Sequence, residues 1–276
     1  MSDEYAIRPL TTIEECRSVV DLEKRVWGYT DAEDVVPVPV LIVSVKRGGI
    51  LLGAFNSGGD MVGFVYSLSA LRNGRASQWS HMLGVLPEAR DSGLGTRLKL
   101  EQRAATLRMG LDLIEWTYDP LQAMNAHLNF SKLGVIVTEY EENIYGESSS
   151  PLHRGTPTDR FVAEWWLSSP EVARRIADAD GPQANPASPV PSVNRVRRQG
   201  SSVECADVDL HRTDPQLAVE IPMGFNQLMR ADPAQALAWR MATRQLFTTY
   251  LHRGYRVVDF FLDRPAGMGR YILASS

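Results

Sequence analysis

Cysteine is scarce in this sequence: only Cys16 and Cys205 occur among 276 residues. Two cysteines cannot build the disulfide framework of a small secreted domain, so we expect a reducing compartment and predict a cytoplasmic protein. Cys16 falls in a helical pattern and is expected to be a small buried apolar residue.

Long apolar runs and an excess of basic residues are also missing. No apolar run reaches the about 20 residues of a membrane span, and the opening residues MSDEYAIRPL lack the basic and apolar parts of a signal peptide. The net charge of -4 argues against a nucleic-acid partner, because phosphate binding needs a basic surface. We therefore expect neither a membrane nor a nucleic-acid partner.

The composition, 44% hydrophobic and 22% charged, is typical of a globular protein with a substantial core. Residues 178–202 are rich in Pro, Ser, Asn and Gly, which predicts a linker. We predict a first domain over 1–177 and a small C-terminal α/β unit over 203–276 that packs on it.

Periodicity and turn residues predict the secondary structure. Helices are expected over 13–27, over the stretch that ends at Gly110, over 170–176 and over 233–252. Residues 36–46 fit a helix or a strand, because β-branched residues are frequent there. Strands are expected over 5–10, 50–55, 61–71, 81–86, 111–116, 135–140, 160–167, 203–208, 216–221, 255–262 and 269–274.

The central feature is a strand, a loop with two glycines and a helix. Strand 81–86 ends at Pro87, Gly93 and Gly95 follow, and the helix begins directly after them. Free N–H groups at a helix N-terminus bind anions, and glycine lets a phosphate approach the backbone. A dinucleotide fingerprint needs a third glycine, and a P-loop needs Gly-Lys-Ser/Thr, whereas Thr96 and Arg97 follow Gly95 here. The pattern predicts another kind of pyrophosphate site.

Arg90-x-x-Gly93-x-Gly95 resembles the acyl-CoA signature of the GNAT superfamily of N-acyltransferases. Flanking motifs agree: Val85-Leu86-Pro87 precedes the loop, and a later helix from Asn125 ends in Lys132-Leu133-Gly134-Val135. Residues 116–121, 143–146 and 157–160 are similar to a group of predicted bacterial acetyltransferases with a C-terminal extension.

The resemblance implies an α/β (α+β) fold with a mixed, mostly antiparallel central sheet flanked by helices. It implies acetyl-CoA or another acyl-CoA as co-substrate and no metal. Pantetheine would pair with the backbone of strand 81–86, the pyrophosphate would bind the loop amides, and an N–H near Val85 would stabilise the oxyanion. The expected cofactor-binding residues are Leu83, Val85, Arg90, Asp91, Ser92, Gly93, Leu94, Gly95, Thr96, Asn125 and Phe130.

His81 is the candidate general base that deprotonates the amine. Strict alternation along the strand places it on the same face as Leu83 and Val85, and an imidazole titrates near neutral pH. A histidine satisfied inside the core is the alternative. The position also matches a histidine that one GNAT enzyme places beside its substrate amine.

The chain departs from the GNAT pattern at the expected general acid. Phe130 stands where many members carry a tyrosine, and Ala123 stands where an asparagine is common. Tyr118 or Tyr145 could protonate the leaving thiolate instead, or the thiolate could leave unaided.

Other polar residues are candidates for the acceptor side or for packing. Tyr118, Asp119, Tyr145, Arg154 and Arg160 would lie near the acceptor if loops form the pocket, although packing or surface roles are more common for such residues. Arg240 and Arg244, four apart on one predicted helix, could bind a carboxylate, although a solvated face is the commoner arrangement.

These observations predict an N-acyltransferase that moves an acyl group from CoA to the primary amine of a small molecule, in a ternary complex. We expect the protein to act alone or as a homodimer. The alternative is an acyl-CoA-binding regulatory module without turnover, which the loss of the usual tyrosine favours.

Overall fold

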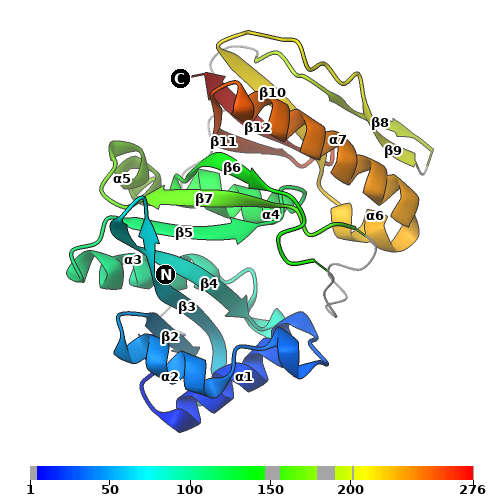
Figure 1. The fold of residues 1–276 in the computed structure, drawn as a ribbon. Helices are drawn as coiled ribbons and strands as arrows, with labels where there is room; N and C mark the ends of the chain where they lie inside the picture. Colours follow the sequence, from blue (N-terminus) through cyan, green and yellow to red (C-terminus); the bar gives the residue numbers. More distant parts are fainter. Residues whose placement is uncertain (1–4, 147–155, 179–189, 201, 276) are drawn as a thin grey trace. The chain divides into compact units, whose positions relative to one another are not determined.

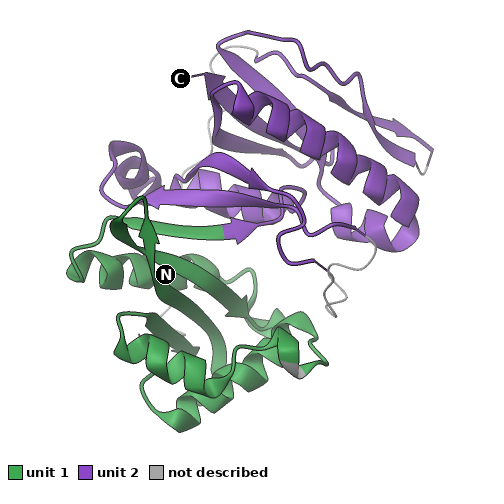
Figure 2. Ribbon diagram, in the orientation of Figure 1, with its two compact units in different colours: residues 1–116, 148–154 green, residues 117–147, 155–276 purple. Residues whose placement is uncertain are grey.

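The structure is a computed structural model that describes residues 5–146, 156–178, 190–200 and 202–275. The chain forms two compact units: unit 1 comprises residues 1–116 and 148–154, and unit 2 comprises residues 117–147 and 155–276 (Figure 2). This division differs from the predicted domains 1–177 and 203–276. The physical reason is strand pairing, because Val257 pairs with Val137 and thereby joins the C-terminal segment to the earlier strand of the same unit.

Unit 1 contains a sheet with helices on both faces (Figure 1). Its strands lie in the order β1-β2-β3-β4-β5, antiparallel except for the parallel pair β4–β5. Its elements are β1 (Ala6–Pro9), α1 (Ile13–Trp27), η1 (Ala32–Asp34), α2 (Val38–Lys46), β2 (Ile50–Phe55), β3 (Met61–Arg72), β4 (Arg75–Val85), η2 (Pro87–Ala89), α3 (Leu94–Arg108) and β5 (Leu113–Tyr118), whose last two residues belong to unit 2.

The two faces of this sheet can be assigned from its glycines. A β-carbon on Gly63 would lie 3.4 Å from Leu98 of α3, whereas one on Gly84 would lie 3.2 Å from Trp27 of α1. Residues paired across antiparallel strands share a face, and successive residues alternate. Helix α3 therefore covers one face, and α1 with α2 covers the other.

Local signals explain how the helices of unit 1 begin. Thr12 and Glu15 form a reciprocal capping box at the start of α1, which satisfies backbone donors that the helix leaves free. The ambiguous stretch 36–46 is helical from Val38 to Lys46, with Pro39 in the first turn, where a missing N–H costs nothing.

Strand β4 begins six residues before the predicted start at 81. The turn Asn73–Gly74 has φ angles of 49° and 78°, and it joins β3 to β4 so that Arg72 pairs with Arg75. An Asn-Gly pair with both φ angles positive is the favoured two-residue hairpin turn. This signal was present in the sequence, and the prediction of a strand limited to 81–86 overlooked it.

Unit 2 contains strands in the order β7-β6-β11-β12-β10, together with the separate hairpin β8–β9. Its elements are α4 (Ala123–Ala126), the π-helix η3 (His127–Leu133), β6 (Ile136–Glu141), β7 (Arg160–Trp166), α5 (Pro170–Ala177), β8 (Arg195–Gln199), β9 (Ser202–Ala206), β10 (Gln216–Pro222), α6 (Phe225–Ala231), α7 (Pro233–His252), β11 (Tyr255–Asp263) and β12 (Met268–Ser275). Strand β8 lies within the predicted linker 178–202, of which 179–189 and 201 lie outside the described residues.

The fold-class prediction of mixed α/β structure built on mostly antiparallel strands with flanking helices is confirmed. In unit 2 the core is aromatic: the rings of Phe161 and Phe247 are 4.5 Å apart, and those of Phe260 and Tyr271 are 4.6 Å apart. Among the described residues, no helix combines the length and apolarity that crossing a bilayer requires.

We predict that Glu23 of α1 makes the stability of the protein depend on pH. Glu23 is fully buried, one carboxylate oxygen accepts a hydrogen bond from Val36 N (2.9 Å), and burial raises its pKa to about 7. The folded state then binds more protons than the unfolded state between about pH 4.5 and pH 7, so the free energy of unfolding should fall as pH rises through this window.

Glu23→Gln should remove this dependence and raise the free energy of unfolding at pH 8 by up to about 3 kcal/mol. Urea unfolding at pH 4.5 and pH 8 measures the effect, with the exposed Glu14→Gln of the same helix as control. Identical pH profiles for wild type and Glu23→Gln would contradict the prediction.

Candidate active site

The two edges of strand β4 are paired to different extents. It pairs with β3 from Arg75 to Val85, but with β5 only at Gln78 and Trp79. Within the described chain, β4 has no pairing with β5 beyond Trp79. Free N–H and C=O groups along this edge can therefore bind an extended ligand as an added strand.

A bulge interrupts β4 at His81. Tyr66 of β3 pairs with Met82, and the next residue, Ser67, pairs with Ser80. His81 is therefore the extra residue of the bulged strand. Bulges redirect side chains and end the strict alternation of faces.

The bulge places His81 on the face covered by α1 and α2. Its ring lies edge-on to Tyr66 with the centroids 6.2 Å apart. Leu83 instead faces Gly95 of α3, and Val85 lies beside Leu98 on the same side as Leu83. The prediction that His81 shares a face with Leu83 and Val85 is therefore wrong.

His81 has the properties of a proton acceptor. Its side chain remains exposed to solvent, yet the surrounding protein desolvates the imidazolium and lowers the pKa below its ordinary value. The neutral imidazole therefore predominates at neutral pH and can accept a proton.

The loop after β4 turns sharply through left-handed backbone. Asp91 has φ 60° and Gly93 has φ 78°, and the Ser92 hydroxyl donates to the Ala89 carbonyl (2.8 Å). A β-carbon at Gly93 would meet nothing within 4 Å, so the positive φ alone favours glycine there.

Helix α3 presents free backbone donors at its N-terminus. The first intrahelical bond runs from Arg97 N to the Gly93 carbonyl, and no side chain caps the helix. The amides of Leu94, Gly95 and Thr96 donate to no acceptor among the described residues. Together with the helix dipole, these donors form an anion site.

Space for a ligand lies next to these amides. A β-carbon on Gly95 would find Leu83 as its nearest neighbour, 4.0 Å away, so the start of α3 is open toward β4. Arg90 donates from Nε to the Val85 carbonyl (3.1 Å), which holds an exposed guanidinium beside the end of β4. The structure thus brings together the predicted residues 83, 85 and 90–96.

The sequence does not reveal a buried polar cluster that forms where β4 packs against α3. Lys99 Nζ donates to Ser80 Oγ (3.0 Å) and Gln102 Oε1 (3.1 Å) and lies 3.6 Å from the centre of the Trp116 ring. Burial holds the pKa of Lys99 well below its ordinary value. Only the i, i+3 spacing of Lys99 and Gln102 on a helix pointed to a shared face.

The remaining predicted residues belong to unit 2 and have diverse surroundings. Phe130 is 1% exposed and packs against Tyr271 in the aromatic core, whereas Asn125 is exposed. Tyr118 is buried, and burial raises its pKa well above the ordinary value, which makes it a weaker proton donor. Tyr145 is 47% exposed and shares a hydrogen bond with Thr117 (2.7 Å). Their proposed catalytic and cofactor roles stay predictions.

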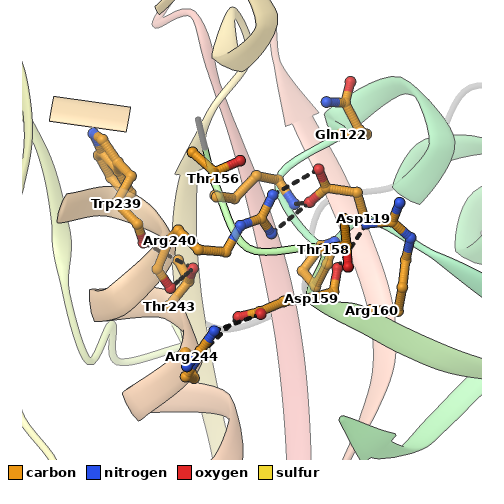
Figure 3. Close-up of polar contacts among 12 residues, drawn as sticks. Asp119, Gln122, Thr156, Thr158, Asp159, Arg160, Trp239, Arg240, Thr243 and Arg244 are labelled. Atoms are coloured by element: carbon orange, nitrogen blue, oxygen red, sulfur yellow. Dashed lines mark hydrogen bonds and ion pairs between the residues drawn. The ribbon is translucent and has the colours of Figure 1, made fainter. Parts of the chain in front are cut away.

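The two arginines of α7 bind carboxylates of their own chain (Figure 3). Arg240 makes two 2.7 Å bonds to Asp119, and Arg244 bonds Asp159 at 2.9 and 2.6 Å. Arg240 is 1% exposed, so the expectation of a solvated face is wrong. Arg160 is also buried, with its guanidinium 5.5 Å from the Tyr145 ring. The acceptor-side candidate Arg154 lies outside the described residues.

The described residues show no candidate metal site. Among the residues that the structure describes, no group of three or more His, Cys, Asp or Glu side chains could hold a metal ion.

Comparison with known proteins gives similarities at the level of structure. The sequence matches no protein-family model and no curated protein. Similar solved structures include the ribosomal-protein-S18-alanine N-acetyltransferase of Escherichia coli, at 14% identity and TM-score 0.48 over 60% of this chain and 95% of that one. A GNAT-family acetyltransferase of Streptococcus pneumoniae has 18% identity and TM-score 0.46 over 58% and 98%.

A third is the PaiA N-acetyltransferase of Thermoplasma acidophilum, solved with coenzyme A, at 18% identity and TM-score 0.41 over 59% of this chain and 98% of that one.

Replacing Gly93 or Gly95 of the loop with alanine should change the free energy of unfolding in opposite directions. Gly93→Ala forces a β-carbon into left-handed backbone and should lower the free energy of unfolding by about 1–2 kcal/mol. Gly95→Ala lies in the first turn of α3 with room for the methyl group and should raise it, by up to about 1 kcal/mol. Urea unfolding of both variants checks the signs, and destabilisation by Gly95→Ala would show that the space beside Leu83 is filled.

Arg240→Met should destabilise the protein strongly. The substitution keeps much of the volume but leaves the Asp119 carboxylate buried without its main partner, at a cost of about 3–5 kcal/mol. The control is Arg174→Met, which breaks an exposed pair with Glu171 and should cost under about 1 kcal/mol. Equal urea midpoints for the two variants would contradict the buried pair.

Proposed function

We propose that this protein is an acyl-CoA-dependent N-acyltransferase that acylates the primary amine of a small molecule by direct attack in a ternary complex. The observation that carries the proposal is the free edge of β4 beside the uncapped start of α3. An extended pantetheine arm needs backbone to pair with, and a pyrophosphate needs converging N–H donors. Both lie in unit 1, and Arg90 adds a positive charge.

His81 acts as the general base in this proposal. It accepts a proton from the attacking amine, whose nitrogen forms a bond to the thioester carbonyl carbon while the carbon–sulfur bond breaks. The CoA thiolate leaves with the electron pair, and its modest basicity allows departure without a strong acid. A backbone N–H near Val85 stabilises the oxyanion that develops at the carbonyl oxygen.

CoA, acetyl-CoA and succinyl-CoA should each be tested for thermal stabilisation of the whole chain. A ligand at about 100 times its Kd adds about 2.7 kcal/mol. The midpoint should therefore rise by several degrees, at roughly 2–4 °C per kcal/mol.

Arg90→Ala should reduce the rise, whereas Arg108→Ala, which removes the same charge from the exposed C-terminal end of α3, should leave it unchanged. No rise with any of the three ligands at millimolar concentration would refute the CoA site.

His81→Ala then separates an enzyme from a binding module. Thiol release from acetyl-CoA with a panel of amines should fall by roughly 10²–10⁴-fold in the variant, with the CoA-induced thermal shift unchanged. Because the neutral imidazole is the active form, the wild-type rate should rise with pH up to a plateau, with its midpoint below the ordinary histidine value. The exposed His252→Ala is the control. CoA binding without turnover for any amine would favour the regulatory module.

A further inference from the structure

A cavity of about 490 Å³ lies between α2 and β3 in unit 1. We call it the α2 trough. Its lining residues are Pro39, Val40, Val43, Ser44 and Arg47 from α2 and its C-terminal end, with Leu68 and Ser69 from β3. None of these residues belongs to the loop 90–96 that we propose as the CoA site.

The outer face of α2 is unusually apolar. Its sequence is VPVLIVSVK, yet only Leu41 is buried, while Val40 is 47% and Val43 is 60% exposed. A surface helix normally turns polar residues to water, and grouped exposed apolar side chains mark a binding surface. The trough is therefore suited to the apolar body of a ligand.

The trough opens on the same face of the sheet as His81. Every second residue of a strand lies on the same face, so Tyr66 and Leu68 share one face of β3. The His81 ring lies edge-on to Tyr66 on this face. Two residues along a strand span roughly 7 Å, and the three from Tyr66 to Ser69 span roughly 10 Å. A ligand that fills the trough and also contacts His81 therefore has to extend past Leu68 by roughly 7 Å along the strand.

The far end of the trough carries a positive charge. Arg47 is exposed, and its carbonyl accepts a hydrogen bond from Ser69 Oγ (2.9 Å), which fixes its backbone. Its guanidinium has no hydrogen bond or ion pair with any described residue. A free guanidinium binds a carboxylate through two parallel hydrogen bonds.

One buried hydroxyl group belongs to the lining of the trough. Ser44 lies in the lining, and its Oγ is close enough to the buried Tyr66 hydroxyl, which is outside the lining, for the two groups to interact.

We propose that the α2 trough binds the acyl acceptor and selects a molecule with an amine at one end and a carboxylate at the other. An extended apolar chain holds these two groups roughly 10 Å apart, and the carboxylate binds Arg47. This inference rests on the proposed N-acyltransferase function. It assigns Val40, Val43 and Leu68 to the apolar chain and directs the amine toward His81. An α-amino acid, with its amine and carboxylate on one carbon, is too short to occupy both ends.

The first test measures binding alone, by calorimetric titration with octanoate, octylamine and 8-aminooctanoate. Octanoate carries the acid and the chain but no amine, so its binding does not depend on catalysis. Arg47→Ala should weaken octanoate and 8-aminooctanoate by about tenfold or more, the usual effect of losing a charged hydrogen-bonded pair. Lys46→Ala, the adjacent exposed cation outside the lining, should change both by less than about twofold.

A second pair of variants tests the apolar wall. Val43→Asn should weaken both acids, whereas Leu71→Asn, 77% exposed and outside the trough, should not. Octylamine binding as tightly as octanoate, or no effect of Arg47→Ala, would overturn the carboxylate assignment. A wild-type dimer that Val43→Asn converts to a monomer in sedimentation would overturn the trough as a ligand site, because the face would then be a subunit contact.

The amine screen completes the test. With acetyl-CoA, 8-aminooctanoate should be acylated faster than octylamine or leucine, and Arg47→Ala should raise its KM with little change in kcat. Preference for leucine would refute the proposed separation. If octanoate binds but CoA gives no thermal shift, the acceptor assignment and the proposed function both fail while the anion site remains. If CoA binds and octanoate does not, the trough proposal alone fails.

Discussion

The short parallel pairing of β4 with β5 is the constraint on which the candidate site depends. Two residue pairs hold the strands together, and beyond Trp79 β4 pairs only with β3 among the residues that the structure describes. An edge left open in this way is normally a liability for aggregation. Here it lies beside the loop and the first turn of α3, whose amides are also free. The unpaired backbone groups of β4 and of the first turn of α3 therefore lie next to each other.

The sequence predicted this loop well because its determinants are local. Gly93 and Gly95 follow from backbone requirements: Gly93 lies in left-handed backbone, and Gly95 is open toward β4. The face of His81 could not be predicted, because it depends on a bulge set by pairing with Tyr66 and Ser67 of another strand. Alternation is a property of a regular strand, and one extra residue reverses it.

The partners of the long-range charge pairs could not be predicted from the sequence either. Arg240 and Arg244 show a helical spacing, but nothing near them in the chain reveals that Asp119 and Asp159 are their partners. Strand β8 was missed for a related reason, since Arg195 to Gln199 contain little to bury and become a strand only by pairing with β9. Local propensity is overridden where tertiary partners supply the stabilisation.

The pairing of α7 with Asp119 and Asp159 also has a consequence for biosynthesis. Nearly all of unit 1 is synthesised before residue 117, so its sheet and helices can form while the rest of the chain is still on the ribosome. Unit 2 cannot be completed in the same way, because Asp119 and Asp159, which become buried, precede their arginines by 121 and 85 residues. Until translation passes Arg244, hydration has to compensate these charges, and the second half of the chain folds only near the end of its synthesis.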